Sequence, residues 1–302
     1  MYGLIEAGGT KFVLAQADAQ GNLHNITTIP TQTPDLTLPQ IYNYFRKVKL
    51  HGLSLACFGP LELNRDLPTY GYITDTPKVA WRNCPIVPNL AEQLPIDSLI
   101  FDTDVNFAAL GEYYFGRGEG SRSTLYLTVG TGIGGGFVQD GNIFKGVSHP
   151  EMGHVLVKPC PGDDFAGCCP YHHNCLEGMA SGPAIMHRYG CQATELGTNH
   201  VVWSYIADYL AQALLTYTVV LRPERICLGG GVMQNPALLP QVQERFTAYA
   251  GNYLPLPPAA TYITLPKLNG RSALYGCLAG LLPAEKISNL QAQLAKAAKA
   301  NE

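Results

Sequence analysis

Charged residues are scarce in this 302-residue chain: Lys, Arg, Asp and Glu make up 14%, and the formal net charge is −3. Proteins that bind nucleic acid usually present a basic face, so this balance argues against a nucleic-acid partner. The N-terminus lacks the basic and apolar stretches of a secretory signal, and we therefore expect a cytoplasmic protein. The most apolar stretch, residues 201–221, contains Asp208 and Gln212. It predicts a buried core helix rather than a membrane span.

Apolar residues make up 46% of the chain, which is long enough for two lobes with a sizeable core. Strands and helices alternate along the first third, and residues 124–129 and 225–228 predict further strands. Both halves contain a strand, a Gly/Thr turn and a returning strand, which hints at a duplicated α/β architecture. Helices are expected near residues 36–49, 105–115, 176–189, 201–221, 239–253 and 272–282 and from about residue 285. The polar, Gly-rich segment 116–123 is a candidate hinge between the halves.

Three glycine-rich turns, at residues 8–11, 130–136 and 229–231, each follow an apolar strand. Glycine lets backbone N–H groups approach phosphate oxygens closely, although any one turn taken alone is as well explained by a tight β-turn. Residues 130–135 formally match the dinucleotide pattern G-x-G-x-x-G, but a hairpin follows where that fold needs a helix. The Walker A pattern is absent. Together the three turns predict phosphate binding by β-hairpin turns.

Nine cysteines in a chain without a leader argue against a disulfide scaffold, and four of them cluster within residues 160–175. Cys169, His172 and Cys175 are spaced three apart, and His154 can supply a fourth ligand. Two thiolates and two imidazoles form a closed tetrahedral set that suits a structural Zn²⁺. Cys168 competes with Cys169 as the ligand, and a metal-free surface loop is the alternative.

Asp104 follows a predicted strand, where a carboxylate can project into a cleft. Phosphoryl transfer to a hydroxyl needs a base to accept the proton, which Asp104 would suit. From spacing alone, a role for Asp102 and Asp104 in capping the next helix is the stronger interpretation.

Several motifs resemble the ROK sugar kinases, and within them the bacterial fructokinases. They are E-A-G-G-T-K-F at 6–12, D-V-N at 104–106, T-V-G-T-G-I-G-G-G at 128–136, H-P-E-M-G-H at 149–154, C-P-Y-H at 169–172, C-L-E-G at 175–178 and A-S-G-P at 180–183. The resemblance spans nearly the whole chain. It implies a two-lobed actin/hexokinase-like α/β fold, a duplicated ribonuclease H-like architecture with a zinc-binding loop. The implied small lobe comprises residues 1–115 plus about 285–302, and the implied large lobe residues 116–284.

The resemblance also assigns roles. It makes Asp104 the base, Glu151, His154 and Glu177 ligands of the sugar hydroxyls, and Glu6 an acidic group that positions Mg²⁺ through water. His154 would then contact both the sugar and Zn²⁺, completing a metal set of His154, Cys169, His172 and Cys175. The implied ATP-binding residues are Gly8, Gly9, Thr10, Lys11, Thr131, Gly132, Pro183, Gly230 and Gly231. ATP, Mg²⁺ and Zn²⁺ are the expected cofactors, a sugar is the partner molecule, and a homodimer is the expected assembly.

Two departures bear on the substrate. Thr103 stands where many glucose-specific relatives have Asn, and the zinc loop reads Cys-Pro-Tyr-His where many have more cysteines. Both favour D-fructose, converted to fructose 6-phosphate, over glucose, mannose or an N-acetylated hexose. A sugar-sensing regulator of the same fold would need an N-terminal helix-turn-helix, and the first glycine turn already begins at residue 8.

Overall fold

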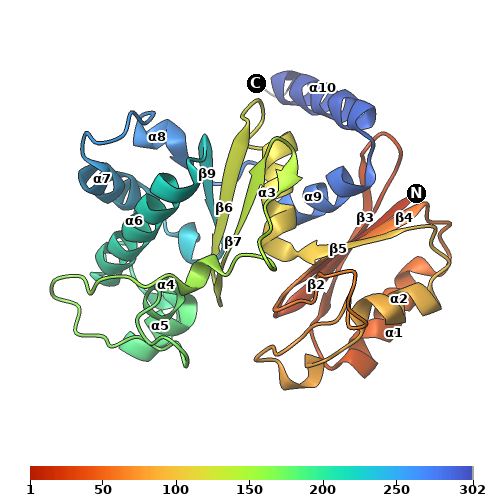
Figure 1. Ribbon diagram of the computed structural model, residues 1–302, viewed down its shortest axis with the longest axis horizontal. Coiled ribbons are helices and arrows are strands. Elements are labelled where there is room, and N and C mark those ends of the chain that lie inside the picture. Colours follow the sequence, from red (N-terminus) through yellow and green to blue (C-terminus); the bar gives the residue numbers. More distant parts are fainter. Residues whose placement is uncertain (301–302) are drawn as a thin grey trace.

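The computed structural model describes residues 1–300, which form two five-stranded sheets with helices between and around them (Figure 1). The first sheet has the order β3-β2-β1-β4-β5 and the second the order β10-β9-β6-β7-β8. The strands are β1 (Tyr2–Ala7), β2 (Lys11–Ala17), β3 (Leu23–Pro30), β4 (Gly52–Cys57), β5 (Leu99–Thr103), β6 (Ser123–Val129), β7 (Ile133–Gln139), β8 (Asn142–Ile143), β9 (Arg225–Gly229) and β10 (Ile263–Thr264).

The helices are α1 (Pro34–Phe45), α2 (Ile86–Gln93), α3 (Asp104–Phe115), α4 (Leu176–Ala180), α5 (Gly182–Tyr189), α6 (Val202–Leu221), α7 (Leu238–Ala250), α8 (Ala259–Tyr262), α9 (Ser272–Leu281) and α10 (Ala284–Ala300). Among residues 1–300, none has the length and hydrophobicity that crossing a membrane requires. All nine cysteines are free thiols.

The two sheets repeat one topology. In the first, β1 pairs antiparallel with β2 and parallel with β4; in the second, β6 pairs antiparallel with β7 and parallel with β9. Each hairpin begins with a buried apolar strand, and an Asp140-Gly141 turn joins β7 to β8 with positive φ at both residues. The duplication suggested by the sequence is therefore present in the strand pairing.

Helices α3 and α9 lie between the two sheets (Figure 1). Their apolar side chains share one core with Leu4 of the first sheet and Tyr126 of the second. Glu112 of α3 is buried there and accepts hydrogen bonds from the backbone N–H groups of Arg117, Lys267 and Leu268 and from Ser272 Oγ. A buried carboxylate with this many donors fixes the segment after α3 to the start of α9.

Three expected elements need correction. Helix α1 ends at Phe45, not at residue 49, so Val48 packs on the core from the following turn. The helix expected over residues 176–189 is two helices, because Ser181 is extended and caps α5 through its side chain. The second glycine run is a turn only at residues 130–132, and the rest of it already belongs to β7.

Helix α10 packs on both α3 and the β2–β3 turn. Its buried Leu290 lies against Gly21, and Gln291 Nε2 donates to the Tyr114 carbonyl at 2.7 Å. The polar C-terminal helix is thus tied to the end of α3.

Candidate active site and metal cluster

Three strands of the first sheet end side by side, and their ends carry the candidate catalytic groups. Ala7 at the end of β1 pairs with Cys57 at the end of β4, and Cys57 pairs with Thr103 at the end of β5. Glu6 lies just before the first glycine turn, and Asp104 follows Thr103. Parallel strand ends are where open α/β sheets bind ligands.

The start of α3 is capped by Thr103. Its side chain accepts from the Asn106 N–H at 3.1 Å, while Asp104 Oδ1 accepts from the adjacent Val105 N–H at 2.9 Å. Asp102 is bonded elsewhere, to the Asn106 amide at 2.7 Å and to Lys145 Nζ at 2.7 Å. The capping function that competed for Asp102 and Asp104 therefore falls to Thr103.

Burial raises the pKa of both carboxyl groups at this edge. Desolvation raises the pKa of Asp104 from 3.8 to about 6, the Val105 N–H and the nearby His149 lower it, and Glu151 raises it. Desolvation raises the pKa of Glu6 from 4.5 to about 7, with Asp104 raising it further and Lys11 lowering it. Glu6 Oε2 is buried without a hydrogen-bond partner among the described residues. Two carboxyl groups with raised pKa values at one strand edge are typical of a catalytic site.

The segment that follows β8 of the second sheet reaches this edge. The His149 ring is almost fully covered and lies against Gly59, which follows β4. His149 Nε2 lies 3.0 Å from Glu151 Oε1, and its Nδ1 lies 3.1 Å from Ser148 Oγ. His149 thereby orients the exposed Glu151 carboxylate, whose charge raises the pKa of Asp104.

The second and third glycine turns lie together. Gly230 has φ of +95°, and a Cβ there would come within 2.3 Å of the Val129 carbonyl oxygen, so the position requires glycine. Gly231 N would lie 3.8 Å from a Cβ on Gly130, and the Gly130 carbonyl accepts from the Gly182 N–H at 2.7 Å. Thr131, Gly132, Pro183, Gly230 and Gly231 are thus gathered in one region where β6, β9 and α5 meet.

Glu177 joins this region to the metal cluster. Its Oε2 accepts from the Ile133 N–H at 2.8 Å, directly after the second glycine turn. Its helix α4 is capped by Cys175, whose Sγ accepts from the Gly178 N–H. Close by, a Cβ on Gly153 would collide with the Ile133 carbonyl oxygen, so only glycine lets the backbone before His154 approach β7.

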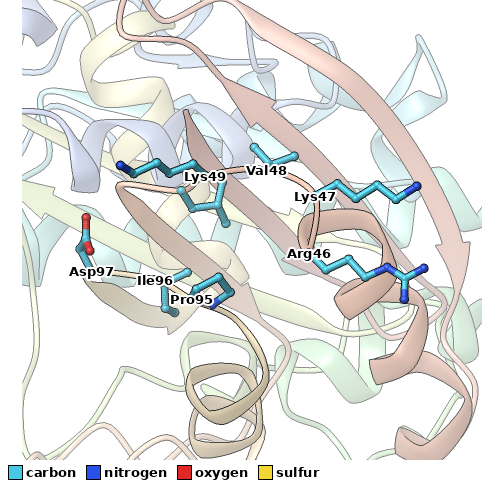
Figure 2. A pocket seen from close by; sticks show the side chains of 8 residues that line it. Arg46, Lys47, Val48, Lys49, Pro95, Ile96 and Asp97 are labelled. Atoms are coloured by element: carbon cyan, nitrogen blue, oxygen red, sulfur yellow. The ribbon is translucent and has the colours of Figure 1, made fainter.

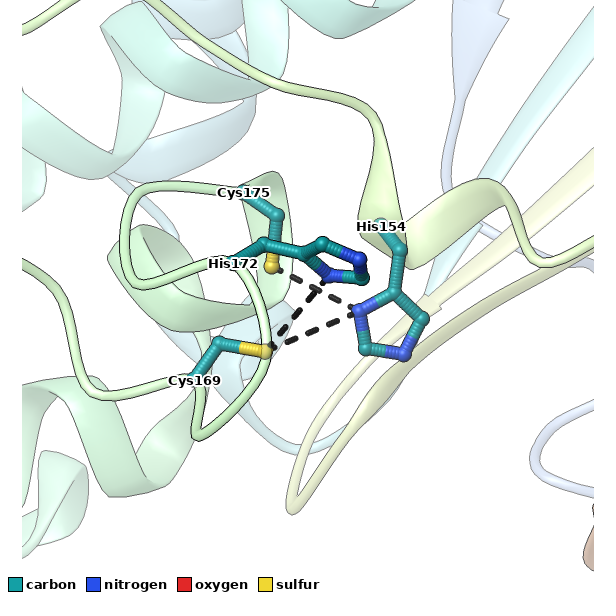
Figure 3. Close-up of side chains that lie close together, drawn as sticks. All are labelled: His154, Cys169, His172 and Cys175. Atoms are coloured by element: carbon teal, nitrogen blue, oxygen red, sulfur yellow. Dashed lines mark hydrogen bonds between the residues drawn. The ribbon is translucent and has the colours of Figure 1, made fainter.

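His154, Cys169, His172 and Cys175 converge on one point (Figure 3). His154 Nδ1 lies 3.5 Å from Cys175 Sγ and 3.9 Å from Cys169 Sγ, and His172 Nδ1 lies 3.8 Å from Cys169 Sγ. A tetrahedral Zn²⁺ with ordinary bond lengths separates its sulfur and nitrogen ligands by about 3.6 Å. The four side chains therefore fit Zn²⁺, and Cys169 rather than Cys168 belongs to the cluster.

The loop that carries two of these cysteines is fixed at its other end by a buried ion pair. Arg188 Nη2 lies 2.9 Å from Asp163 Oδ2, and Tyr209 OH donates to the same oxygen at 2.7 Å. The Arg188 guanidinium also stacks on the Phe165 ring, 4.1 Å from its centre. A buried pair with this many bonds holds its loop in one geometry.

The other predicted residues divide between the two sheets. Gly8, Gly9 and Thr10 form the β1–β2 turn of the first sheet and Lys11 begins β2, whereas the other two glycine turns belong to the second sheet. A surface hollow lies at the N-terminal ends of β4 and β5, opposite the ends that carry the candidate site. It is lined by Arg46, Lys47 and Lys49 and by residues 95–97 (Figure 2). Because the whole length of β5 separates it from Asp104, this hollow is not part of the candidate active site. Sequence reasoning assigned no role to His149, although the motif that supplied Glu151 contains it.

Comparison with known proteins identifies the family. The model of the ROK family matches residues 2–282. The chain belongs to the ROK family. The fructokinase of Lactococcus lactis subsp. cremoris is 42% identical over 277 residues, covering 90% of this chain and 94% of that protein. The fructokinase of Pediococcus pentosaceus is 40% identical over 285 residues, covering 94% and 98%.

A solved structure confirms the expected fold. The ROK family glucokinase from Streptomyces griseus, in complex with glucose and AMPPNP, superposes with a TM-score of 0.69 at 21% identity, covering 90% of this chain and 96% of that one. The resemblance to bacterial fructokinases is confirmed as well, because relatives of that name match over nearly the full length of the ROK protein described here.

Proposed function

We propose that this ROK protein transfers the γ-phosphoryl group of ATP to D-fructose and releases fructose 6-phosphate. The observation that carries the proposal is an identity of about 40% with fructokinases over nine tenths or more of both chains. The carboxylates at the edge of the first sheet support it, because they have the pKa values that a base near neutral pH requires.

Asp104 accepts the proton of the sugar hydroxyl in this proposal. With a pKa of about 6, the carboxylate is mostly ionised at pH 7 and yet basic enough to accept a proton as the new bond forms. Its Oδ1 is oriented by the Val105 N–H, and the Thr103 cap fixes the turn that carries it. Positioning of this kind accounts for much of the catalysis of phosphoryl transfer.

Glu151, His154 and Glu177 form the sugar-binding wall in the same proposal. Carboxylates accept the paired O–H donors of a hexose well, and Glu177 is oriented by the Ile133 N–H. His154, Cys169, His172 and Cys175 would hold Zn²⁺, which supplies a structural cross-link. His154 Nδ1 faces the two cysteine sulfurs, and its ring then links the cluster to the sugar wall.

The three glycine turns bind the ATP phosphates in this proposal, with Glu6 positioning Mg²⁺ through water. Mg²⁺ neutralises charge on the phosphate oxygens. In the same proposal a small lobe, residues 1–115 with about 285–302, and a large lobe, residues 116–284, close on the sugar; residues 301–302 lie outside the part of the chain that the structure describes. The similarity to ROK kinases further leads us to propose a homodimer in the cytoplasm, which sedimentation of the purified protein and cell fractionation would test.

A coupled assay of ADP release across hexoses tests the activity. Fructose should give the highest kcat/KM, with glucose, mannose and N-acetylated hexoses lower, because each displaced hydroxyl loses hydrogen bonds to the wall. Glucose outpacing fructose would overturn the substrate assignment, and ADP release that no hexose stimulates would overturn the activity.

A further inference from the structure

A lysine from a distant part of the chain covers the first glycine turn. Lys78 lies in the segment between β4 and α2, and a Cβ on Gly9 would lie 3.2 Å from Lys78 Cε and 4.0 Å from its Nζ. The ammonium group is thus beside the backbone of the turn that is proposed to bind phosphate.

The segment that presents Lys78 is firmly anchored. Trp81 is buried, its Nε1 donates to the Gln32 carbonyl at 2.7 Å, and its ring stacks on Phe12 with 5.5 Å between centres. The Trp81 N–H donates to the Lys78 carbonyl at 2.8 Å, and the Lys78 N–H lies 3.4 Å from Thr76 Oγ1. Lys78 is therefore held at the turn by its backbone.

Lys78 has no ion-pair partner among the side chains that the structure describes. The side chain is half-buried, and no carboxylate oxygen among the side chains that the structure describes lies within 4.0 Å of its ammonium nitrogen. By contrast, Lys145 pairs with the buried Asp102 at 2.7 Å. A half-buried ammonium beside the N–H groups of a glycine turn favours an anionic ligand at that place.

The location of Lys78 indicates which phosphate group of ATP it would contact. The first glycine turn follows β1, whose end pairs with β4 and through it with the strand that precedes Asp104. Lys78 and Asp104 therefore lie along one edge of the first sheet, on the acceptor side, whereas the second and third glycine turns belong to the other sheet. The phosphate nearest the acceptor hydroxyl is the one that is transferred.

We propose that Lys78 binds the phosphoryl group under transfer, on ATP before the reaction and on the sugar after it. This proposal rests on the proposed kinase function. The sugar hydroxyl oxygen forms a bond to the γ-phosphorus, and the bond from that phosphorus to the bridging oxygen breaks. The electron pair of that bond leaves with ADP, and the hydroxyl proton goes to Asp104. Lys78 keeps all its protons and offsets charge on the phosphoryl oxygens.

Calorimetry tests the proposed role of Lys78. The affinities of wild type and Lys78→Met are measured for AMPPNP, ADP, fructose 6-phosphate and fructose, with Mg²⁺ present. Methionine keeps the length of the side chain and removes its charge. A charged hydrogen bond to a phosphate corresponds to about a tenfold to hundredfold change in affinity. AMPPNP and fructose 6-phosphate should therefore bind about tenfold or more weakly, whereas ADP and fructose should stay within about twofold. Lys78→Arg should restore part of the loss, and Lys47→Met, in the exposed hollow of Figure 2, should change nothing.

Any other pattern of affinities in Lys78→Met overturns the proposal. Equal weakening of ADP would assign Lys78 to the other phosphates, equal weakening of fructose would assign it to the sugar hydroxyls, and no change would leave it structural. Thermal melts of both Lys78 variants show whether they fold, and Lys78→Arg carries the test if Lys78→Met does not. The comparison of AMPPNP with ADP uses no sugar, so its result is independent of whether fructose is the substrate.

Discussion

Two regions differ in how their polar groups are satisfied. One is the strand edge with Glu6 and Asp104, and the other is the proposed sugar-binding wall with His154 and Glu177, next to the Cys/His cluster. At the strand edge, Glu6 Oε2 has no partner among residues 1–300, and burial raises the pKa values of both carboxyl groups. In the wall, Glu177 accepts a backbone hydrogen bond, and His154 Nδ1 lies within 3.9 Å of two cysteine sulfurs.

The difference indicates that the strand edge lowers the free energy of unfolding and that the wall raises it. A carboxylate that folding desolvates without compensation opposes folding, yet its raised pKa makes it an effective base. A wall of bonded groups stabilises the fold and holds a ligand in one geometry. Substitutions should therefore separate activity from stability at the strand edge and lower both together in the wall.

Replacing the proposed base gives the largest expected effect. Asp104→Asn should lower kcat about 10²–10⁴-fold, because the amide cannot accept the hydroxyl proton, while its oxygen still accepts from the Val105 N–H. The same variant should be more stable, since the shift of the Asp104 pKa from 3.8 to about 6 corresponds to about 3 kcal/mol at most. Steady-state kinetics and urea unfolding at pH 7.5 or so measure the two effects on one preparation.

The sign of the stability effect follows from proton binding. Between about pH 4 and pH 6 the folded protein binds the Asp104 proton and the unfolded chain does not, so wild-type stability rises as pH falls through this window. The advantage of the variant should be full above about pH 6 and vanish below about pH 4. Asp97→Asn is the control, because Asp97 is exposed and lies just before the opposite end of β5. It should change neither kcat nor the free energy of unfolding. Near-normal turnover in Asp104→Asn would reassign the base.

Breaking the metal cluster is the next largest change, and it should lower stability and activity together. Wild-type protein should contain about one Zn²⁺ per chain, and Cys175→Ser should weaken Zn²⁺ binding about tenfold to a hundredfold or more. Because Cys175 also caps the helix that carries Glu177, the KM for fructose should rise with the loss of metal. Elemental analysis, thermal melts and kinetics on the same samples measure all three.

The adjacent cysteine provides the matched control. Cys168→Ser changes the same atom type one residue outside the cluster and should keep the metal content of wild type, whereas Cys169→Ser should lose it. Equal metal content in all three variants, or a well-folded wild type without metal, would show that the wall is not held by Zn²⁺.

The regions of this comparison were not equally predictable from sequence. Local patterns were enough to predict the glycine turns and the Cys/His cluster, because spacing along the chain largely determines both. Spacing could not choose between Cys168 and Cys169. The structure does, because the His173 N–H donates to the Cys169 carbonyl and closes the loop that places Cys169 in the cluster. Lys78 was not predicted at all, because only the packing of Trp81 on Phe12 brings it to a turn almost seventy residues earlier. Spacing alone favoured a capping role for Asp102 and Asp104, and the structure corrects this because Thr103 caps the helix; the role of Asp104 as the base stays a proposal.

The smallest expected effect is a change in the shape of the pH profile. The kcat/KM for ATP should fall as pH drops below about 7, where Glu6 takes up a proton, and should fall more steeply below about 6, where Asp104 does. Glu6→Gln removes the first ionisation, so its profile should start from a lower plateau and bend once, near pH 6. A profile for Glu6→Gln that still bends near pH 7 would mean that another group titrates there.

Because Asp104 raises the pKa of Glu6 through its charge, Asp104→Asn should also move the Glu6 ionisation to lower pH, which a titration of Glu6 by NMR can follow without any turnover. That coupling between two neighbouring carboxyl groups is a property of the strand edge alone and is expected even with the metal cluster intact.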